Sequence, residues 1–431
     1  MGNLNKNQKT LISIHVIRMI LELFTSTFLT SHILSFSADN VLGTGLLNVG
    51  LFFVAEFTVY AVLYYIVCFY VDKSNRIGFL RIGIFVNLCL LVLLVFFGEQ
   101  LASWVILAGV IVGISDAFYY PSYLVMKNEF TSRKTVNDYN ISSTILTNIA
   151  KVIVPTILGF LIDVSSYSNI AIYIIIISLI QFAISFIIKT KRPENSQFEL
   201  KPFFKFLKDN KEVRNKIKYT YFNALLVGAK STYKIIVIVL TIYTFKTNLS
   251  LGLFTSIFSI LIILLLMLFK KLDNKQNSNK LWFYLLIGIL PVASCVILVA
   301  KMTKVTLIVY NFFLTLATYF SEYFGSSERD AIIKHIGKYE YIAEHQFLIE
   351  TLQNISRMVA YGVLAVVGLI GNITVFKVLL IVLILSNPIK YLVMYKQRKI
   401  RIEYEMAAAS KQTSEALETT ESPIKLTLNN K

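Results

Sequence analysis

The sequence predicts an all-α integral membrane protein of two six-helix halves, on three observations. First, 56% of the 431 residues are apolar and 16% are charged, whereas globular domains average about 45–50% apolar and about 25% charged. Second, twelve apolar stretches have about the 20 residues that a transmembrane helix needs. Third, polar residues of the fourth and fifth stretches recur in the tenth and eleventh. Lipid is therefore the main solvent of this chain.

The twelve predicted spans are separated by short polar segments. They lie at about residues 11–35, 45–70, 79–97, 101–126, 140–162, 170–188, 219–245, 249–269, 281–300, 305–327, 346–370 and 374–394. The first span is long, contains Arg18 and Glu22, and has no small-residue cleavage site after it. We therefore expect it to be retained rather than removed as a signal peptide.

The basic residues predict the topology. The chain carries 42 Lys and Arg against 25 Asp and Glu, a formal net charge of +17. With the N-terminus placed inside, most of these cations fall in inside segments, and the outside segments hold only Lys246, Lys301, Lys304 and Lys377. Because short loops rich in Lys and Arg are cytoplasmic, we expect both termini in the cytoplasm, with the protein in the cell membrane of a bacterium. The charge then reflects topology and not nucleic-acid binding.

The longest connection divides the chain into domains. Residues 1–188 are predicted to form an N-terminal six-helix bundle and residues 219–400 a C-terminal one. The linker 189–218 has apolar residues at helical spacing with cations between them, which is typical of a helix on an anionic cytoplasmic leaflet; a solvated tether is the alternative. The tail 401–431 is rich in Thr, Ser and Glu and is predicted to be disordered.

An internal repeat relates the two halves. A shift of 206 residues aligns the fourth and fifth spans with the tenth and eleventh without a gap. The aligned pairs are Asp116 with Glu322, Asp138 with Glu344, Asn140 with Gln346, Asn148 with Asn354, and Lys151 with Arg357. Chemically similar polar pairs at one offset, in a chain with few polar residues, indicate a duplication.

The loop after the second span resembles a family motif. Residues 72–76, Asp-Lys-Ser-Asn-Arg, are similar to the Gly-x-x-x-Asp-Arg-x-Gly-Arg-Arg loop of the major facilitator superfamily of secondary transporters. Cys68 and Asn75 stand where the family has glycine, and Asn tolerates left-handed backbone geometry. The basic residue that the family has early in the fourth span has no counterpart in 104–113. The resemblance covers the chain to about residue 400 and implies the fold of that superfamily.

The fourth and fifth spans carry a second resemblance. Residues 113–122, Gly-Ile-Ser-Asp-Ala-Phe-Tyr-Tyr-Pro-Ser, with Asn148 to Pro155 and Gly159, resemble the macrolide-efflux branch of the superfamily. This resemblance implies efflux as the direction of transport.

Ionisable residues inside spans are costly and are functional candidates by default. Asp116 and Lys151 lie at similar depths, about 15–17 Å from the cytoplasmic face at about 1.5 Å per residue. The repeat gives Glu322 and Arg357 the same relation. We therefore expect two pseudo-symmetric ion pairs, Asp116 with Lys151 and Glu322 with Arg357. Simple neutralisation without a role in transport is the alternative.

Two carboxylates are candidates for proton coupling. Glu22 lies deep in the first span, one turn after Arg18, which can neutralise it, and Glu56 lies near the middle of the second span. Burial disfavours the charged form of a carboxylate, so such a group can exchange a proton as its access changes. We expect Glu22 first, and Glu56 second, to couple transport to protons.

The predicted substrate cavity centres on the seventh span. Asn223, Lys230 and Lys234 occur there at helical spacing, and two cations one turn apart repel unless a carboxylate or a ligand lies between them. The lysines can bind an anionic substrate group or pair with Glu22, Glu56 or Glu350. The cavity candidates also include aromatic residues of the fourth and tenth spans, Tyr119, Tyr319 and Tyr323, whose rings are apolar with a polar tip; packing is the alternative.

The resemblance implies a cytoplasmic gate. Asp72 ends the second span and Arg76 follows it in the loop, where they can pair with neighbouring helix ends when the cytoplasmic side is closed. Solvation in the loop is the alternative.

Together these features predict a secondary active transporter of a small, amphipathic or anionic solute. We expect proton-coupled efflux by a monomer that has the lipid bilayer as its surroundings and needs no cofactor. An importer or a lipid or glycolipid flippase is the alternative on this fold; a receptor or a membrane transferase is an alternative of another class. The sequence contains no paired-histidine metal motif, phosphate-binding Gly-rich loop or Asp-rich cluster at a span end, so we expect no metal site and no enzyme activity.

Overall fold

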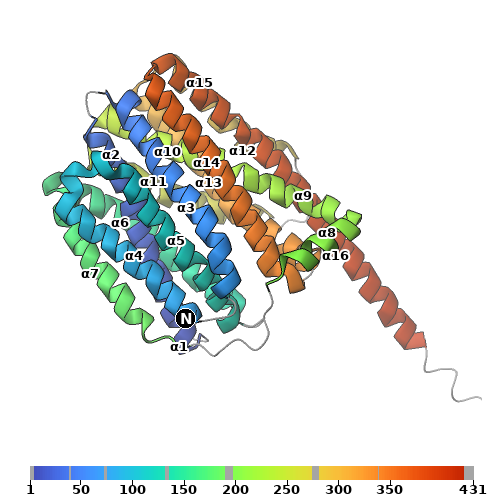
Figure 1. Cartoon of the computed structure of the whole chain (residues 1–431). Helices are drawn as coiled ribbons and strands as arrows, with labels where there is room; N and C mark the ends of the chain where they lie inside the picture. The colour runs from blue at the N-terminus through green and yellow to red at the C-terminus, as the bar shows by residue number, and fades with distance from the viewer. Residues whose placement is uncertain are drawn as a thin grey trace, which may run out of the picture.

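The computed structural model describes residues 4–37, 40–71, 75–131, 135–189, 198–273, 281–337 and 339–421. Within these ranges the chain is helical and has no strand. The helices form two bundles that lie side by side, coloured blue to green and yellow to red in Figure 1. We call them the N half and the C half.

The N half contains the first seven α-helices and three short turns of other helix types. Their bounds are α1 (Lys6–Leu23), the π-helix η1 (Phe24–Phe28), α2 (Leu29–Ser35), the π-helix η3 (Val41–Gly45), α3 (Leu46–Val71), α4 (Arg76–Phe97), the 3₁₀ turn η4 (Gly98–Gln100), α5 (Leu101–Phe130), α6 (Val136–Val164) and α7 (Tyr167–Ser185). α1, η1 and α2 run on as one long segment, Lys6–Ser35.

The linker and the C half follow. Their elements are α8 (Leu200–Asp209), α9 (Lys211–Leu225), α10 (Val227–Phe245), α11 (Asn248–Asp273), α12 (Leu281–Ala300), α13 (Lys304–His335), the 3₁₀ turn η5 (Tyr339–Tyr341), α14 (Ile342–Ile370), α15 (Ile373–Ile384) and α16 (Ser386–Glu421). Several helices begin at a polar N-cap, as where Asn372 accepts a hydrogen bond from the backbone N–H of Thr374 at 2.8 Å.

The predicted spans fall on helical segments, except that α7 ends three residues before 188. The span 219–245 is divided between α9 and α10, and the span 374–394 between α15 and α16. In the described part, ten helical segments are long and apolar enough to cross a membrane, and α4 and α5 share one of them, Arg76–Lys127. The apolar run Asn248–Leu261 of α11 is shorter. The all-α membrane fold is therefore confirmed, while the number of crossings and the side of the termini stay predictions.

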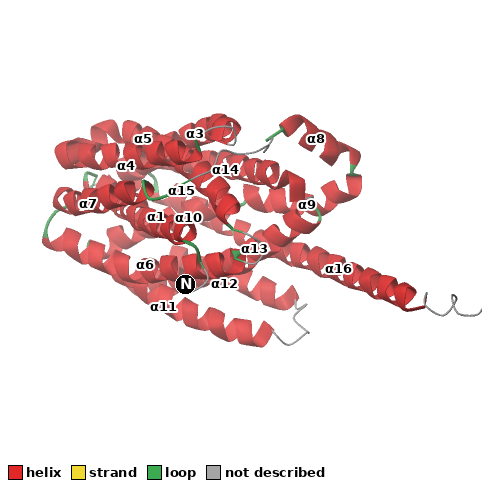
Figure 2. Cartoon of the chain, turned by 90° about the horizontal axis from the view of Figure 1, so that it is seen from below, coloured by secondary structure: helices red, strands yellow, loops and turns green. Residues whose placement is uncertain are grey.

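Two long helix pairs join the halves, α3 with α14 and α6 with α11, and both pairs lie side by side in Figures 1 and 2. Both need a glycine at a close approach. A Cβ on Gly50 of α3 would lie 2.7 Å from the Cα of Ala365 on α14, and a Cβ on Gly252 of α11 would lie 2.2 Å from the carbonyl oxygen of Pro155 on α6. Near the second glycine, the Thr156 hydroxyl donates to Ser256 Oγ at 2.7 Å.

The linker packs on the start of α14 at one end of the molecule (Figures 1 and 2). The predicted single helix is broken at Asn210 into α8 and α9, and α9 runs past residue 218 to Leu225. The apolar side of α8 covers α14, because Phe203 is buried and its ring meets the His345 ring at 4.8 Å. Lipid contact of its exposed outer side, which carries Phe204, stays a prediction.

The described part of the tail, for which the sequence predicts disorder, is a helix. α16 continues to Glu421 and extends beyond the body of the molecule (Figure 2), and residues 422–431 lie outside the described ranges. Residues 401–421 are rich in Ala and Glu, which favour helix. Arg401 also anchors α16 to α13 through Glu328, 2.8 Å away and buried.

Candidate functional site

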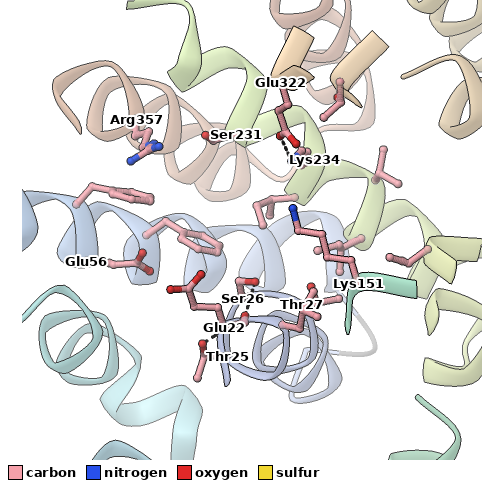
Figure 3. Close-up of a pocket in the computed structure, with 18 of the residues that line it drawn as sticks. Glu22, Thr25, Ser26, Thr27, Glu56, Lys151, Ser231, Lys234, Glu322 and Arg357 are labelled. Atoms are coloured by element: carbon pink, nitrogen blue, oxygen red, sulfur yellow. Dashed lines mark hydrogen bonds and ion pairs between the residues drawn. The ribbon is translucent and has the colours of Figure 1, made fainter. Parts of the chain in front are cut away.

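A cavity of about 620 Å³ lies between the two halves. Its walls come from α1, η1, α3, α5 and α6 of the N half and from α10, α11, α13 and α14 of the C half. The wall is largely apolar and aromatic but carries ionisable side chains from both halves, drawn in Figure 3. A concave, mostly apolar site with a few polar groups is the usual form of a small-molecule binding site.

On the N-half wall, Arg18 holds two carboxylates. Its Nε donates to Glu22 Oε1 at 3.1 Å, and its Nη2 donates to Asp116 Oδ1 on α5. Its Nη1 donates to the Ser115 hydroxyl at 3.0 Å. Glu22 also accepts a hydrogen bond from the Tyr120 hydroxyl. We call Arg18, Glu22 and Asp116 the N-half triad, and its one cation is only 1% exposed.

On the C-half wall, Glu322 holds two cations. Lys230 Nζ lies 2.8 Å and Lys234 Nζ 3.2 Å from the same oxygen, Glu322 Oε1. We call Lys230, Lys234 and Glu322 the C-half triad. Lys390 of α16 is buried beside it and donates to the Ser321 hydroxyl at 2.9 Å.

The predicted ion pairs Asp116 with Lys151 and Glu322 with Arg357 are wrong. Asp116 pairs with Arg18, and Glu322 pairs with Lys230 and Lys234. Equal depth allowed the predicted pairs, but the first helix of each half supplies cations that reach the same carboxylates. The predicted pairing of Lys230 and Lys234 with Glu22, Glu56 or Glu350 is wrong for the same reason. The pairing of Arg18 with Glu22 is confirmed.

Lys151 and Arg357 nevertheless line the cavity from opposite halves. Among the described residues Lys151 has no ion pair or hydrogen bond. The Arg357 guanidinium donates to the amide oxygen of Asn354 at 3.0 Å and lies 5.0 Å from the centroid of the Phe57 ring. Neither cation meets a carboxylate in the described structure, so both can act on a solute.

The two proton-coupling candidates have different surroundings. Both line the cavity. Glu22 belongs to the N-half triad, whereas Glu56 on α3 is 7% exposed and, in the part of the chain that is described, makes no ion pair or hydrogen bond. On the C half, Glu350 accepts a hydrogen bond from the Gln346 side chain at 3.0 Å. Glu56 is thus a buried carboxylate without local compensation.

The predicted substrate-cavity residues divide into three groups. Lys234 and Tyr319 line the cavity. Three others are not part of the cavity lining: Lys230, Asn223 on α9, and Tyr119. Tyr119 is buried, and its ring centroid lies 5.0 Å from the Arg18 guanidinium carbon. The side chain of Tyr323 lies outside those that the structure describes.

The predicted gate is described at one of its two residues. Arg76 Nη1 lies 2.6 Å from Glu129 Oε2, which joins the start of α4 to the end of α5. Asp72 lies outside the described residues. The pair Arg76 with Glu129 fits the expected latch onto a neighbouring helix end, and its role in gating stays a prediction.

Sequence reasoning missed Lys390. Lys390 lies inside the predicted span 374–394, where an ionisable residue marks a functional candidate. Tyr120 directly follows Tyr119, and only the rotation of α5 decides which of the two rings faces the cavity.

The repeat reappears in the site. Ser115 and Asp116 of α5 correspond at the offset of 206 to Ser321 and Glu322 of α13. Each serine and its neighbouring acid accept hydrogen bonds from cations, Arg18 in the N half and Lys390 and Lys230 in the C half. Lys151 of α6 and Arg357 of α14 correspond at the same offset and both line the cavity. The fourth and fifth spans of each half thus supply equivalent parts of the wall.

One curated relative in sequence and two solved transporter structures are similar to this chain. A Bacillus subtilis protein described as uncharacterized, YqgE, is 26% identical over 253 residues, which are 57% of this chain and 56% of that protein. A crystal structure of a peptide transporter, POT, in complex with alafosfalin superposes with a TM-score of 0.67 at 10% identity, over 93% of this chain and 95% of that one. A bacterial homologue of the iron transporter ferroportin, in an inward-facing state, gives 0.68 at 11% identity, over 91% and 98%.

The amino-acid sequence also shows which family the chain belongs to. The sequence model of the Major Facilitator Superfamily matches residues 14–340, which include the N-half triad, the linker and the C-half triad. The chain therefore belongs to the Major Facilitator Superfamily and is a multi-pass membrane transporter, not an enzyme.

Proposed function

We propose that this transporter moves a small solute through the central cavity by alternating access and couples that movement to protons at Glu56. The observation that carries the proposal is a buried carboxylate, without a partner in the described structure, in the wall of a cavity between two halves. An uncompensated charge at such a place is costly, so the group favours taking up a proton.

Glu56 fits the coupling role better than Glu22. Glu22 accepts hydrogen bonds from Arg18 and Tyr120, which compensate its charge within the protein. Glu56 has no such donor among the described residues, so a proton or a solute must supply the compensation. Glu56 also lies on α3, one of the helices that join the halves, so its charge state bears directly on their contact.

Alternating access needs two halves that rock about a central site, as superfamily members built from repeats do. The two triads are each confined to one half, so each half keeps its own charges paired as it moves. The groups that change surroundings are then those between the halves: Glu56, Lys151 and Arg357. Efflux is the proposed direction, on the resemblance of α5 and α6, and import on the same scaffold is the alternative.

Flux in proteoliposomes tests the proposal. A growth and toxicity screen with a deletion strain selects solutes, and purified protein in vesicles of known orientation is given a pH gradient. We expect solute movement against its gradient in the wild type. Glu56→Gln should abolish gradient-driven accumulation and keep solute exchange at equal pH, because glutamine keeps the shape and loses the exchangeable proton.

The matched control is Glu99→Gln on the exposed turn η4, which should behave as the wild type. If Glu56→Gln still accumulates solute under the pH gradient, Glu56 is not the coupling group. If the wild type binds solute and moves none, the protein is a receptor and the transport proposal fails.

A further inference from the structure

The two triads are built on equivalent helices. α1 and α10 are the first helices of the two halves, and α5 and α13 carry the corresponding acids Asp116 and Glu322. Arg18 and Glu22 are spaced i, i+4 on α1, and Lys230 and Lys234 have the same spacing on α10. In both triads the earlier residue is a cation that pairs with the acid on the partner helix, and its side chain is 2% exposed for Arg18 and 12% exposed for Lys230. Arg18 therefore corresponds to Lys230, and Glu22 to Lys234.

The correspondence shows one inversion of charge. The N-half triad has one cation and two carboxylates, whereas the C-half triad has two cations and one carboxylate. The members that differ in sign are Glu22 and Lys234, and both line the cavity, with side chains 24% and 48% exposed. The inverted position is therefore the one that faces the solute, while Arg18 and Lys230 are held more deeply.

Other cavity residues extend the two charged sides. Figure 3 shows Glu22 and Glu56 on one side of the open space and Arg357 with the Glu322 and Lys234 pair on the other, while the Lys151 side chain points into the space. Glu56 has no cation partner, and Lys151 has no carboxylate partner, among the described residues. Each side thus has charge left over after its internal pairs are formed.

From this inversion we infer that the cavity binds a zwitterionic small solute, and the inference rests on the proposed transport through it. The cationic group of the solute lies against Glu22 of the N half, while Glu56 keeps its proposed role in proton coupling. Its anionic group lies against Lys234 and Arg357 of the C half, with Lys151 beside it. A solute with one charge leaves one side uncompensated, and an apolar solute leaves both, which a low-dielectric site penalises.

The arrangement also gives the solute a mechanical role. One end binds the N half and the other binds the C half, so a bound zwitterion bridges the two bodies that must move. Charge-assisted hydrogen bonds are the stronger ones in proteins, and two of them at opposite ends fix the orientation of the solute. The cavity of about 620 Å³ limits the solute to small molecules.

Binding to the purified full-length protein in detergent tests the inference without requiring transport. The probes are unbranched ω-amino acids from glycine to aminooctanoate, each compared with its N-acetyl and its amide form, and the readout is the shift in melting temperature with ligand concentration. We expect at least one ω-amino acid to bind, and each masked form to bind at least about tenfold more weakly, as loss of one charge-assisted contact predicts.

Charge-inverted variants make the test specific to the two positions. Lys234→Glu gives the C half the charges of the N-half triad, and Glu22→Lys gives the N half those of the C-half triad, so each new arrangement already exists in the other half. Lys234→Glu should favour α,ω-diamines over ω-amino acids, and Glu22→Lys should favour α,ω-dicarboxylates. Lys301→Gln, outside the cavity, is the control and should keep the wild-type preference.

The inference is overturned if the acetylated or amidated forms bind as well as the parent, if no ω-amino acid binds, or if folded inverted variants keep the wild-type preference. Should the variants fail to fold, the masked series on the wild type still decides. Binding of the zwitterion without flux contradicts the proposed transport and leaves the inference standing. Flux of a singly charged solute alone overturns the inference and leaves transport standing.

Discussion

The carboxylate of Asp163, in the last turn of α6, accepts hydrogen bonds from the backbone amides of Asn248 and Leu249, which begin α11. The distances are 3.0 Å and 2.7 Å, and the Asn248 side chain adds a third bond at 2.8 Å. A carboxylate at the C-terminus of its own helix is disfavoured, but at the N-terminus of another helix it is favoured. Asp163 therefore caps a helix of the opposite half and holds the halves together at this end.

Loss of this cap should open the halves at the Asp163 end. Asp163→Asn removes the charge and should cost about 1–2 kcal/mol. The ratio of molecules with the halves joined at this end to molecules with them separated should therefore fall about 5–30-fold. Spin labels on cysteines at Val164 and Thr247, with the three native cysteines replaced by alanine, measure the distance between the halves. We expect a longer distance to gain population. Glu99→Gln, at an exposed site, should leave the distribution unchanged.

Removal of Arg18 should destabilise the protein far more than removal of Lys151. Arg18→Met leaves two partly buried carboxylates without their cation, a loss of about 3–5 kcal/mol, whereas Lys151 pairs with no carboxylate in the described structure. The apparent melting temperature in detergent measures both variants. We expect a large decrease for Arg18→Met, partial recovery on adding Asp116→Asn, and little change for Lys151→Met. Equal decreases for the two single variants would restore the pairing of Asp116 with Lys151.

Glu322 should be essential for the stability of the C half. Glu322→Gln leaves Lys230 and Lys234 one turn apart without their carboxylate, and two like charges at this spacing repel. We expect a lower melting temperature, and recovery of part of the loss when Lys234→Gln removes the repulsion. A double variant no more stable than Glu322→Gln would show that Lys234 contributes nothing to this network.

The helices could be predicted from the sequence, because a helix that crosses lipid must be long and apolar, and the predicted spans contain few polar residues. The repeat could be found as well, and it led to Asp116 and Glu322 as central acids. Sequence spacing also paired Arg18 with Glu22 correctly, since both lie on one helix.

The partners of these acids could not be predicted, because sequence gives depth in the membrane but not the rotation of each helix or its neighbours. Asp116 and Lys151 are at similar depth, yet Asp116 forms its ion pair with Arg18, which lies on a third helix. Lys390 was missed through its place near the end of a span, although it reaches back to Ser321. The charge inversion between Glu22 and Lys234 emerges only when both triads are seen in three dimensions.

A reversible cross-link between the halves tests the central claim, transport by alternating access, most directly. Thr156 and Ser256 join α6 to α11 with their hydroxyl oxygens 2.7 Å apart, so Thr156→Cys with Ser256→Cys, on a background without native cysteines, places two thiols at bonding range. Flux of the solute that the wild type carries best is measured in proteoliposomes before oxidation, after oxidation and after reduction. We predict that flux falls to the level of empty vesicles on oxidation and returns on reduction, while each single variant is unaffected. Undiminished flux through the fully cross-linked protein would contradict the account.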